Sequence, residues 1–240
     1  QNWIVEYGPA GFILGNGIQQ FVDTPLFVST TLNPSTSYDF YVKSVCSDEL
    51  TSIWTPVVTC STPCSAVQVP YVENMESYTG TAVGEAGVIP ECWSYLSDAS
   101  PARAPHISTY NAVSGVNGLV LTAKNASGFS ADNYVALPWF SSNLNGLKIS
   151  FMSRMDNAAQ GALTLGYFTN VSDASSFVVL ESVPSTTAAG AHEYSLYGRN
   201  IPDGARLAFR WYSASPAWDW RCVIDDVSVD FLPCPPVSNV

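Results

Sequence analysis

The feature that most constrains this fold is a chain-long series of short apolar or alternating segments, each bounded by turn residues. Glycine and proline occur 16 times each, and apolar residues nowhere keep a helical spacing over a long stretch. β-Branched and aromatic residues dominate the segments, which favours strands. The predicted strands are Trp3–Tyr7, Leu26–Thr30, Tyr38–Val45, Gly118–Thr122, Leu147–Met152, Ala162–Phe168, Phe177–Ser182, Arg206–Tyr212 and Val223–Phe231. We therefore expect an all-β protein built from β-sandwiches.

The charge balance excludes two classes of partner. Nine Lys or Arg stand against 20 Asp or Glu, so the formal net charge is -11. Nucleic-acid binding through phosphates needs clustered cations, and anionic membrane surfaces attract basic segments. Apolar runs also stop short of the roughly 20 residues that span a membrane. We expect neither nucleic-acid binding nor membrane insertion, and any secretion signal would lie outside this segment.

A cluster of turn residues near 61–69 divides the chain into two parts. Before it, Leu32–Val42 (LNPSTSYDFYV) places a core leucine, a proline turn and a strand-opening tyrosine in the order of a tyrosine corner, whose hydroxyl bonds to upstream backbone. With Trp3–Phe12 and Val57–Thr62, this pattern resembles a fibronectin type III domain, a β-sandwich, over residues 1–62. The first two strands of that family have no counterpart here. They are either cut off or supplied by another chain.

After the boundary, four stretches resemble the cleaved-adhesin, or choice-of-anchor J, jelly roll of secreted bacterial adhesins, a relative of MAM domains. They are Val72–Tyr78, Ile89–Trp93, Arg206–Trp211 and Cys222–Val229. Asn74-Met75-Glu76 stands where the family's first strand usually carries Asp-Phe-Glu, and Ile224-Asp225-Asp226 matches its last strand. The resemblance covers residues 66–232 and implies a β jelly-roll sandwich. Residues 233–240 resemble the start of a following module.

These resemblances imply a secreted, multi-module protein of the bacterial cell surface. The expected function is non-catalytic adhesion to a glycan or a host surface protein, with neighbouring modules of the same protein as further partners. Two other functions stay open: a structural spacer in a repeat array, and an accessory domain of a secreted hydrolase or protease. Catalysis is not expected, because the chain has no Gly-x-Ser-x-Gly motif and only two isolated histidines, His106 and His192.

One aromatic stretch, Trp218-Asp219-Trp220-Arg221, is the best candidate for ligand binding. Sugars stack their apolar faces on such rings, while Asp219 and Arg221 offer hydrogen bonds to hydroxyl groups. The alternative is that both tryptophans cap the sandwich and the arginine stem covers them. The tryptophans expected in the core or at an interface between modules are Trp3, Trp54 and Trp139.

Acidic residues, taken together with the jelly-roll resemblance, predict a calcium site. Adjacent Asp225 and Asp226 repel each other unless something pairs them, and the jelly-roll resemblance places Glu76 in the neighbouring strand. A structural Ca²⁺ ion would supply the pairing, with Asp98 as a loop ligand. The alternative is a strand end at which one carboxylate binds backbone amides and the other faces solvent.

Six cysteines in a chain with few lysines indicate an oxidising compartment. None lies in a CxxC pair, and scattered buried thiols of a cytosolic protein are the alternative. The terminal strands of a jelly roll are commonly neighbours, so the resemblance implies a disulfide between the module's two ends. The expected pairs are Cys92 with Cys222, Cys64 with Cys234 and Cys46 with Cys60.

Overall fold

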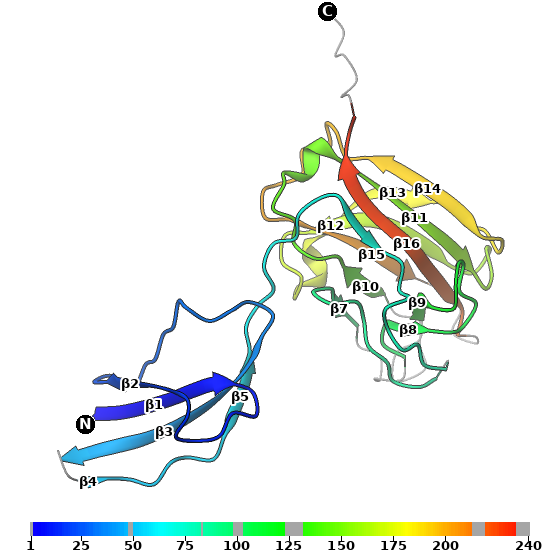
Figure 1. The fold of residues 1–240 in the computed structure, drawn as a ribbon. Helices are drawn as coiled ribbons and strands as arrows, with labels where there is room; N and C mark the ends of the chain where they lie inside the picture. The colour runs from blue at the N-terminus through cyan, green and yellow to red at the C-terminus, as the bar shows by residue number, and fades with distance from the viewer. Residues whose placement is uncertain are drawn as a thin grey trace, which may run out of the picture. The chain divides into compact units, whose positions relative to one another are not determined.

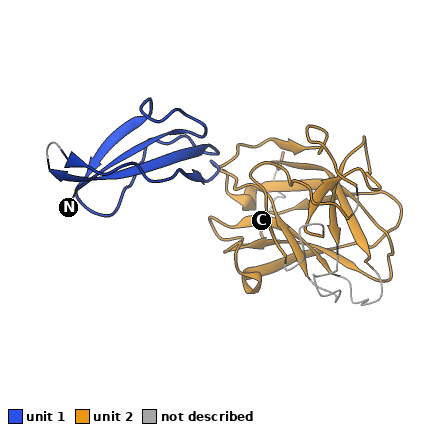
Figure 2. Cartoon of the chain, turned by 90° about the horizontal axis from the view of Figure 1, so that it is seen from below, with its two compact units in different colours: residues 1–65 blue, residues 66–240 orange. Residues whose placement is uncertain are grey.

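The computed structural model describes residues 2–47, 50–82, 84–97, 103–122, 132–212 and 219–233. The chain forms two units, Gln1–Ser65 and Ala66–Val240, called unit 1 and unit 2 below (Figure 2). Over the described residues, the regular structure is strand apart from two single-turn 3-10 helices (Figure 1). The expectation of an all-β protein is therefore confirmed. No helix in these ranges is long and apolar enough to cross a membrane.

Unit 1 is a single antiparallel sheet in the order β2-β1-β3-β4, with β5 also paired to β3. Its strands are β1 Asn2–Pro9, β2 Ile18–Val22, β3 Ser37–Ser47, β4 Leu50–Thr51 and β5 Val58–Ser61. Val5, Tyr7 and Tyr38 form a small buried core on this sheet. The backbone amide of Asn33 donates to the Tyr38 hydroxyl at 3.0 Å, which is the contact that the tyrosine-corner pattern predicts.

The predicted strand Leu26–Thr30 is wrong, because these residues form no strand in the structure. Phe27 instead packs its ring against Tyr7, with 5.2 Å between centroids. An extended segment becomes a strand only where a neighbour pairs with its backbone, and none of the described strands pairs with residues 26–30. The segment therefore contributes packing alone, and Leu26 stays exposed.

Unit 2 is a sandwich of two antiparallel sheets (Figure 1). One has the order β13-β12-β15-β10-β7, and the other has the order β14-β11-β16-β9-β8 with β6 paired to β16. The strands are β6 Tyr71–Glu73, β7 Ser94–Leu96, β8 His106–Ser108, β9 Gly118–Thr122, β10 Asn133–Ala136, β11 Leu147–Met155, β12 Ala162–Phe168, β13 Phe177–Val183, β14 Gly190–Ser195, β15 Arg206–Tyr212 and β16 Arg221–Phe231. The 3-10 helices are η1 Leu144–Gly146 and η2 Ala174–Ser176. As expected, β6 and β16, the first and last described strands of unit 2, are neighbours.

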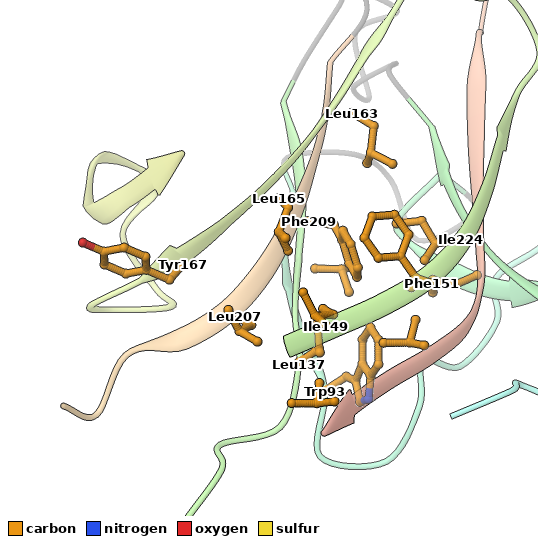
Figure 3. Packing of buried hydrophobic residues seen from close by; sticks show 14 of the residues in the cluster. Trp93, Leu137, Ile149, Phe151, Leu163, Leu165, Tyr167, Leu207, Phe209 and Ile224 are labelled. Atoms are coloured by element: carbon orange, nitrogen blue, oxygen red, sulfur yellow. The ribbon is translucent and has the colours of Figure 1, made fainter. Parts of the chain in front are cut away.

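The core of unit 2 lies between the two sheets (Figure 3). Buried and half-buried residues alternate along the whole of β11, so Ile149 and Phe151 point inward. Leu165 and Phe209 meet them from the other sheet, and the rings of Phe151 and Phe209 pack edge to face with centroids 4.7 Å apart. Burial of each such side chain stabilises the fold by roughly 1.5–3 kcal/mol. The packed sheets give a rigid support to the loops at both ends of β11.

A β-bulge in β16 decides where the adjacent aspartates point. Ser150 pairs with Ser228 but Met152 pairs with Asp225, so β16 carries an extra residue between these pairs. Asp226 adopts a φ of 48° there, a left-handed conformation that Asp tolerates better than most residues. The bulge changes which residues face the core, namely Cys222 and Ile224 before it and Val227 and Val229 after it. Asp225 lies outside that core, and it is buried where it accepts the amides of Val113 and Ser114.

Cys64 and Cys92 form a disulfide, so the predicted pairing of Cys92 with Cys222 and of Cys64 with Cys234 is wrong. Cys222 is a free and fully buried thiol. It lies opposite β9, whereas β6 pairs with β16 farther along, at residues 227–229. Neighbouring terminal strands therefore do not bring a partner to Cys222. Cys234 lies outside the described residues.

Cys46 and Cys60 are also free thiols, so the third predicted pair is wrong. Cys60 lies opposite Tyr38 in the pairing of β3 with β5. Cys46 lies near the other end of β3, about 27 Å farther along at ~3.4 Å per residue. A disulfide needs Cα atoms within about 7 Å of each other, which this register does not allow.

Candidate functional site

A pocket of about 440 Å³ opens at one end of the unit 2 sandwich. Its described lining residues are Tyr110, Asp156, Asp219, Trp220 and Arg221. They come from the loop after β8, the residue after β11 and the start of β16. Because β11 and β16 are antiparallel, with Met155 opposite Cys222, the end of one strand lies beside the start of the other. Strand pairing thus collects polar side chains from distant parts of the sequence.

Arg221 joins the two carboxylates of the pocket. Its Nη2 atom lies 3.1 Å from Asp219 Oδ2, and its Nη1 atom lies 3.7 Å from Asp156 Oδ2. Arg103 adds a second guanidinium, with Nη1 at 2.8 Å from Asp219 Oδ2. The side chains of Arg221, Asp219 and Asp156 are 19, 17 and 14% exposed. These ion pairs are therefore less screened by water and salt than pairs on an open surface.

Tyr110 orients both a carboxylate and a cation. Its hydroxyl donates to Asp156 Oδ1 at 3.0 Å, and the guanidinium carbon of Arg221 lies 5.1 Å from its ring centroid. Burial, together with the hydrogen bond to Asp156, raises the pKa of Tyr110. The hydroxyl therefore stays protonated at neutral pH and remains a donor.

Trp220 is half-buried between the core and the pocket. Its backbone carbonyl accepts a hydrogen bond from Nε1 of the fully buried Trp211 at 3.1 Å, and its side chain packs against the core. Trp218, the other predicted ring, lies outside the described residues. The structure thus brings three of the four predicted ligand-binding residues, Asp219, Trp220 and Arg221, to one pocket.

Two buried atoms of this cluster lack a hydrogen-bond partner among the described residues: Oδ1 of Asp219 and Nε of Arg221. A buried polar atom without a partner costs roughly 1–3 kcal/mol, so native proteins leave few of them. Here one atom is an acceptor and the other is a donor. A hydroxyl group matches both, because it donates and accepts.

Arg103, Tyr110 and Asp156 were not predicted from the sequence. Asp156 lies 65 positions from Arg221, and Arg103 lies 116 positions from Asp219. Only strand pairing brings them together, and no local motif marks that pairing. The available signal is weak: Asp156 follows one predicted strand, and Arg221 precedes another.

Glu76, a predicted calcium ligand, holds the loop before β9. Its Oε1 atom accepts hydrogen bonds from the amides of Val116 and Asn117, at 2.9 and 3.0 Å. Gly115 has a φ of 54°, and a Cβ atom there would collide with the Glu76 carboxylate. Glycine is therefore required at the closest approach of this loop.

Asp225 is fully buried and holds the same loop. Its Oδ2 atom accepts hydrogen bonds from the amides of Val113 and Ser114 at 3.1 and 3.0 Å, and its Oδ1 atom accepts one from Asp226 at 2.8 Å. Burial raises the pKa of Asp225 above its ordinary value, although these hydrogen bonds act in the opposite direction. The carboxyl group is a structural acceptor for three backbone amides.

Calcium binding by these residues stays a prediction. Over the described ranges, no three acidic, histidine or cysteine side chains gather as metal ligands, and Asp98 lies outside them. The carboxylate oxygens of Glu76 and Asp225 face amide donors rather than a common cation position. Asp226 forms the bulge. The described donor set fits hydrogen bonding to the loop and does not fit a Ca²⁺ shell.

Neither histidine is among the described residues that line the pocket. The Nδ1 atom of buried His106 lies 2.7 Å from the carbonyl oxygen of Ala104. The Nε2 atom of His192 lies 2.9 Å from Ser153 Oγ, and burial lowers the pKa of His192. Since Ser153 is fully buried in β11, a substrate cannot reach it. The serine–histidine contact is structural.

Several solved structures resemble this chain in fold. The K1 cleaved adhesin domain of Lys-gingipain from Porphyromonas gingivalis W83 has 15% identity and a TM-score of 0.47, over 68% of this chain and 99% of that domain. The carbohydrate-binding module TmCBM61, solved with β-1,4-galactotriose, has 13% identity and a TM-score of 0.42, over 59% of this chain and 90% of that module. The CBM22-1 xylan-binding domain of Paenibacillus barcinonensis Xyn10C has 11% identity and a TM-score of 0.41, over 70% of this chain and 99% of that domain.

No protein family and no curated protein matches the sequence. The structural likenesses have low identities and TM-scores below 0.5, so they assign neither a family nor a ligand. The resemblances to fibronectin type III and choice-of-anchor J domains stay predictions.

Proposed function

We propose that unit 2 is a non-catalytic carbohydrate-binding module, and that sugar hydroxyls bind in the pocket around Arg221. The observation that carries this proposal is a pocket of about 440 Å³ whose described wall combines two aromatic residues, two carboxylates and a guanidinium. Carbohydrates present apolar C–H faces beside hydroxyl groups that donate and accept hydrogen bonds. The wall offers a partner to each of these features.

The charges of the site favour neutral sugars over acidic ones. Arg103 and Arg221 are matched by Asp156 and Asp219 within one network. Such a cluster has no excess cation for a carboxylate or sulfate on the ligand. The net charge of -11 on the whole chain also repels anionic glycans.

The same contacts argue for binding without hydrolysis. A glycosidase needs one carboxyl group that holds a proton and a second that is ionised. Asp156 and Asp219 each contact the guanidinium of Arg221, so the two carboxyl groups do not have the contrasting surroundings of a glycosidase pair.

We also propose that the module works outside the cell, on a bacterial surface. The supporting observation is the Cys64–Cys92 disulfide, because disulfides persist in oxidising compartments. Two alternatives are distinguished by the test below. In one, the ligand is a host surface protein instead of a glycan. In the other, the module is a spacer and has no ligand.

An array of neutral and acidic glycans, probed with the full chain, tests the proposal. We expect binding to neutral glycans, and we expect Tyr110→Ala to weaken it, because the Tyr110 ring lines the pocket. Tyr197→Ala is the matched control, since Tyr197 is 44% exposed and lies outside the described pocket wall. Thermal melts check that each variant is folded. No binding by the folded wild type, or equal binding by Tyr110→Ala, would contradict the proposal.

A further inference from the structure

Unit 2 carries an exposed tryptophan away from the pocket around Arg221. Trp139 is 52% exposed, although Leu137 and Phe140 close to it are buried. Trp139 is therefore not a core residue. Tryptophan is highly buried on average, so an exposed indole beside a cavity is a candidate surface for a ligand.

The backbone around Trp139 is held rigidly. The Val67 amide donates to the Trp139 carbonyl at 2.7 Å, and the Ser141 amide donates to the Val67 carbonyl at 3.0 Å. Phe140 packs edge to face against Tyr71, with ring centroids 5.5 Å apart. The indole is therefore presented by a fixed segment rather than by a loose loop.

A pocket of about 420 Å³ lies beside this ring. Buried Phe140, Leu144 and Ala205 supply its apolar floor. The rest of its described lining besides Trp139 is Ser141, Ser142, Asn143, Pro202, Asp203 and Gly204. An apolar floor with a few polar groups at its rim is the usual form of a small-ligand site.

Hydrogen bonds organise the polar rim. Asn143 Nδ2 donates to Asp203 Oδ1 at 2.9 Å. Asn145 locks the loop before β15, because its Nδ2 atom donates to the Ile201 carbonyl at 2.8 Å and its Oδ1 atom accepts from the Ile201 amide at 2.9 Å. The rim is thus arranged before a ligand arrives, which reduces the entropy lost on binding.

The rim chemistry fits a neutral sugar. Asp203 is the one charged residue among the described lining residues, so the pocket offers no cation to an acidic ligand. The side chains of Ser141, Ser142 and Asn143 both donate and accept hydrogen bonds, as sugar hydroxyls do. A cationic ligand would use acceptors alone and would give no partner to the Ser142 hydroxyl as a donor.

We infer that the Trp139 pocket is a second carbohydrate-binding site, in which a sugar ring stacks on the indole and its hydroxyls meet Asn143 and Asp203. Leu144 of this pocket precedes β11, whereas Asp156 of the first pocket follows it. β11 has nine residues, which span about 27 Å, so a trisaccharide occupies one site at a time. Two sites on one module raise the avidity for a polysaccharide that reaches both.

Selective ¹⁵N labelling of tryptophan in the full chain reads both sites in one titration. Trp139→Phe identifies the Trp139 indole signal by its loss, and Trp220→Phe identifies the other signal. The probes are xylotriose, cellotriose, mannotriose and β-1,4-galactotriose. We expect at least one probe to shift the Trp139 signal saturably, and the Asn143→Ala/Asp203→Ala chain to bind it about tenfold more weakly or worse.

Tyr95→Ala is the matched control, because Tyr95 is 48% exposed and lines neither pocket, and it should leave this response intact. A Trp139 signal that none of the four probes moves would overturn the inference. So would a signal that moves with a lysine amide but not with the sugars, because the pocket would then be a cation site. If the pocket around Arg221 binds no sugar, the probes leave the Trp220 signal unchanged. The Trp139 signal still shifts in that case, and it also shifts in the Arg221→Ala chain.

Discussion

The guanidinium of Arg221 lies over the ring of Tyr110, with its central carbon 5.1 Å from the ring centroid. This contact joins the first residue of β16 to the loop after β8. Asp156 connects to both, because its Oδ1 atom accepts from the Tyr110 hydroxyl and its Oδ2 atom lies 3.7 Å from Arg221 Nη1. Three residues from three segments therefore orient one another, and the pocket wall is organised without a ligand.

Tyr110→Phe removes the hydroxyl that orients Asp156 and keeps the ring beneath Arg221. We expect the free energy of unfolding to fall by about 0.5–1.5 kcal/mol, the usual net value of one hydrogen bond. Urea denaturation followed by tryptophan fluorescence measures it, and Tyr197→Phe is the exposed control. A Tyr110→Phe chain as stable as the wild type would show that this hydrogen bond does not contribute to the fold.

Asp225→Asn tests the buried carboxyl group. The substitution turns one acceptor oxygen into a donor, so at least one of the amides of Val113, Ser114 and Asp226 loses its partner. We expect a loss of about 1–3 kcal/mol in the free energy of unfolding at neutral pH. An unchanged free energy of unfolding would mean that the loop does not depend on these hydrogen bonds.

The stability difference between wild type and Asp225→Asn should depend on pH. Because burial raises the pKa of Asp225, the folded state keeps this proton to a higher pH than the unfolded state does. The contribution of Asp225 is then fully present below the unfolded pKa of about 4 and is lost as pH rises through the folded pKa. Urea denaturation at pH 4 and pH 7 should show the larger wild-type advantage at pH 4. If the stability advantage of the wild type over Asp225→Asn grows with pH, the pKa of Asp225 is not raised in the folded state.

The thiol of Cys222 should not react with alkylating reagents in the native chain. It is fully buried, and burial raises the pKa of its thiol, whereas Cys46 and Cys60 are exposed. Iodoacetamide should label Cys46 and Cys60 in the native chain and Cys222 only after denaturation. Peptide mapping without reduction should link Cys64 to Cys92. Native labelling of Cys222 at the rate of Cys60, or a disulfide from it, would contradict the structure.

Chelation tests the calcium prediction. Backbone amides bind Oε1 of Glu76 and both oxygens of Asp225. If these contacts are the whole role of the two carboxylates, EDTA and added Ca²⁺ leave the melting temperature unchanged. A bound ion would instead stabilise the native state by mass action. A melting temperature that falls with EDTA and recovers with Ca²⁺ would establish the ion.

Strands could be predicted from the sequence wherever one face packs against a core. The alternation of Ile149 and Phe151 with half-buried neighbours identifies β11 directly. Leu26–Thr30 has the same strand-like composition but forms no ladder. Composition reports what a side chain prefers, whereas a strand also needs a distant backbone to pair with.

The candidate site could be predicted only in part. Asp219, Trp220 and Arg221 stand out because aromatic and charged residues are adjacent in the sequence. Asp156 does not, because its place in the pocket depends on the register of β11 against β16. Tyr110 does not either, because it lies in the loop after β8, far from these strands in the sequence. The same register sets the surroundings of Cys222, which is why its predicted disulfide failed.

The most direct test of the central claim is calorimetric titration with the neutral oligosaccharide that binds best on the array. All chains carry Trp139→Ala, so that only the pocket around Arg221 reports. Arg199→Ala is the matched control, because Arg199 pairs with Glu181 outside this pocket. We expect Arg221→Ala to weaken binding by about tenfold or more, with Arg199→Ala unchanged. Equal affinity of folded Arg221→Ala and its parent would contradict the proposal that this pocket holds the sugar.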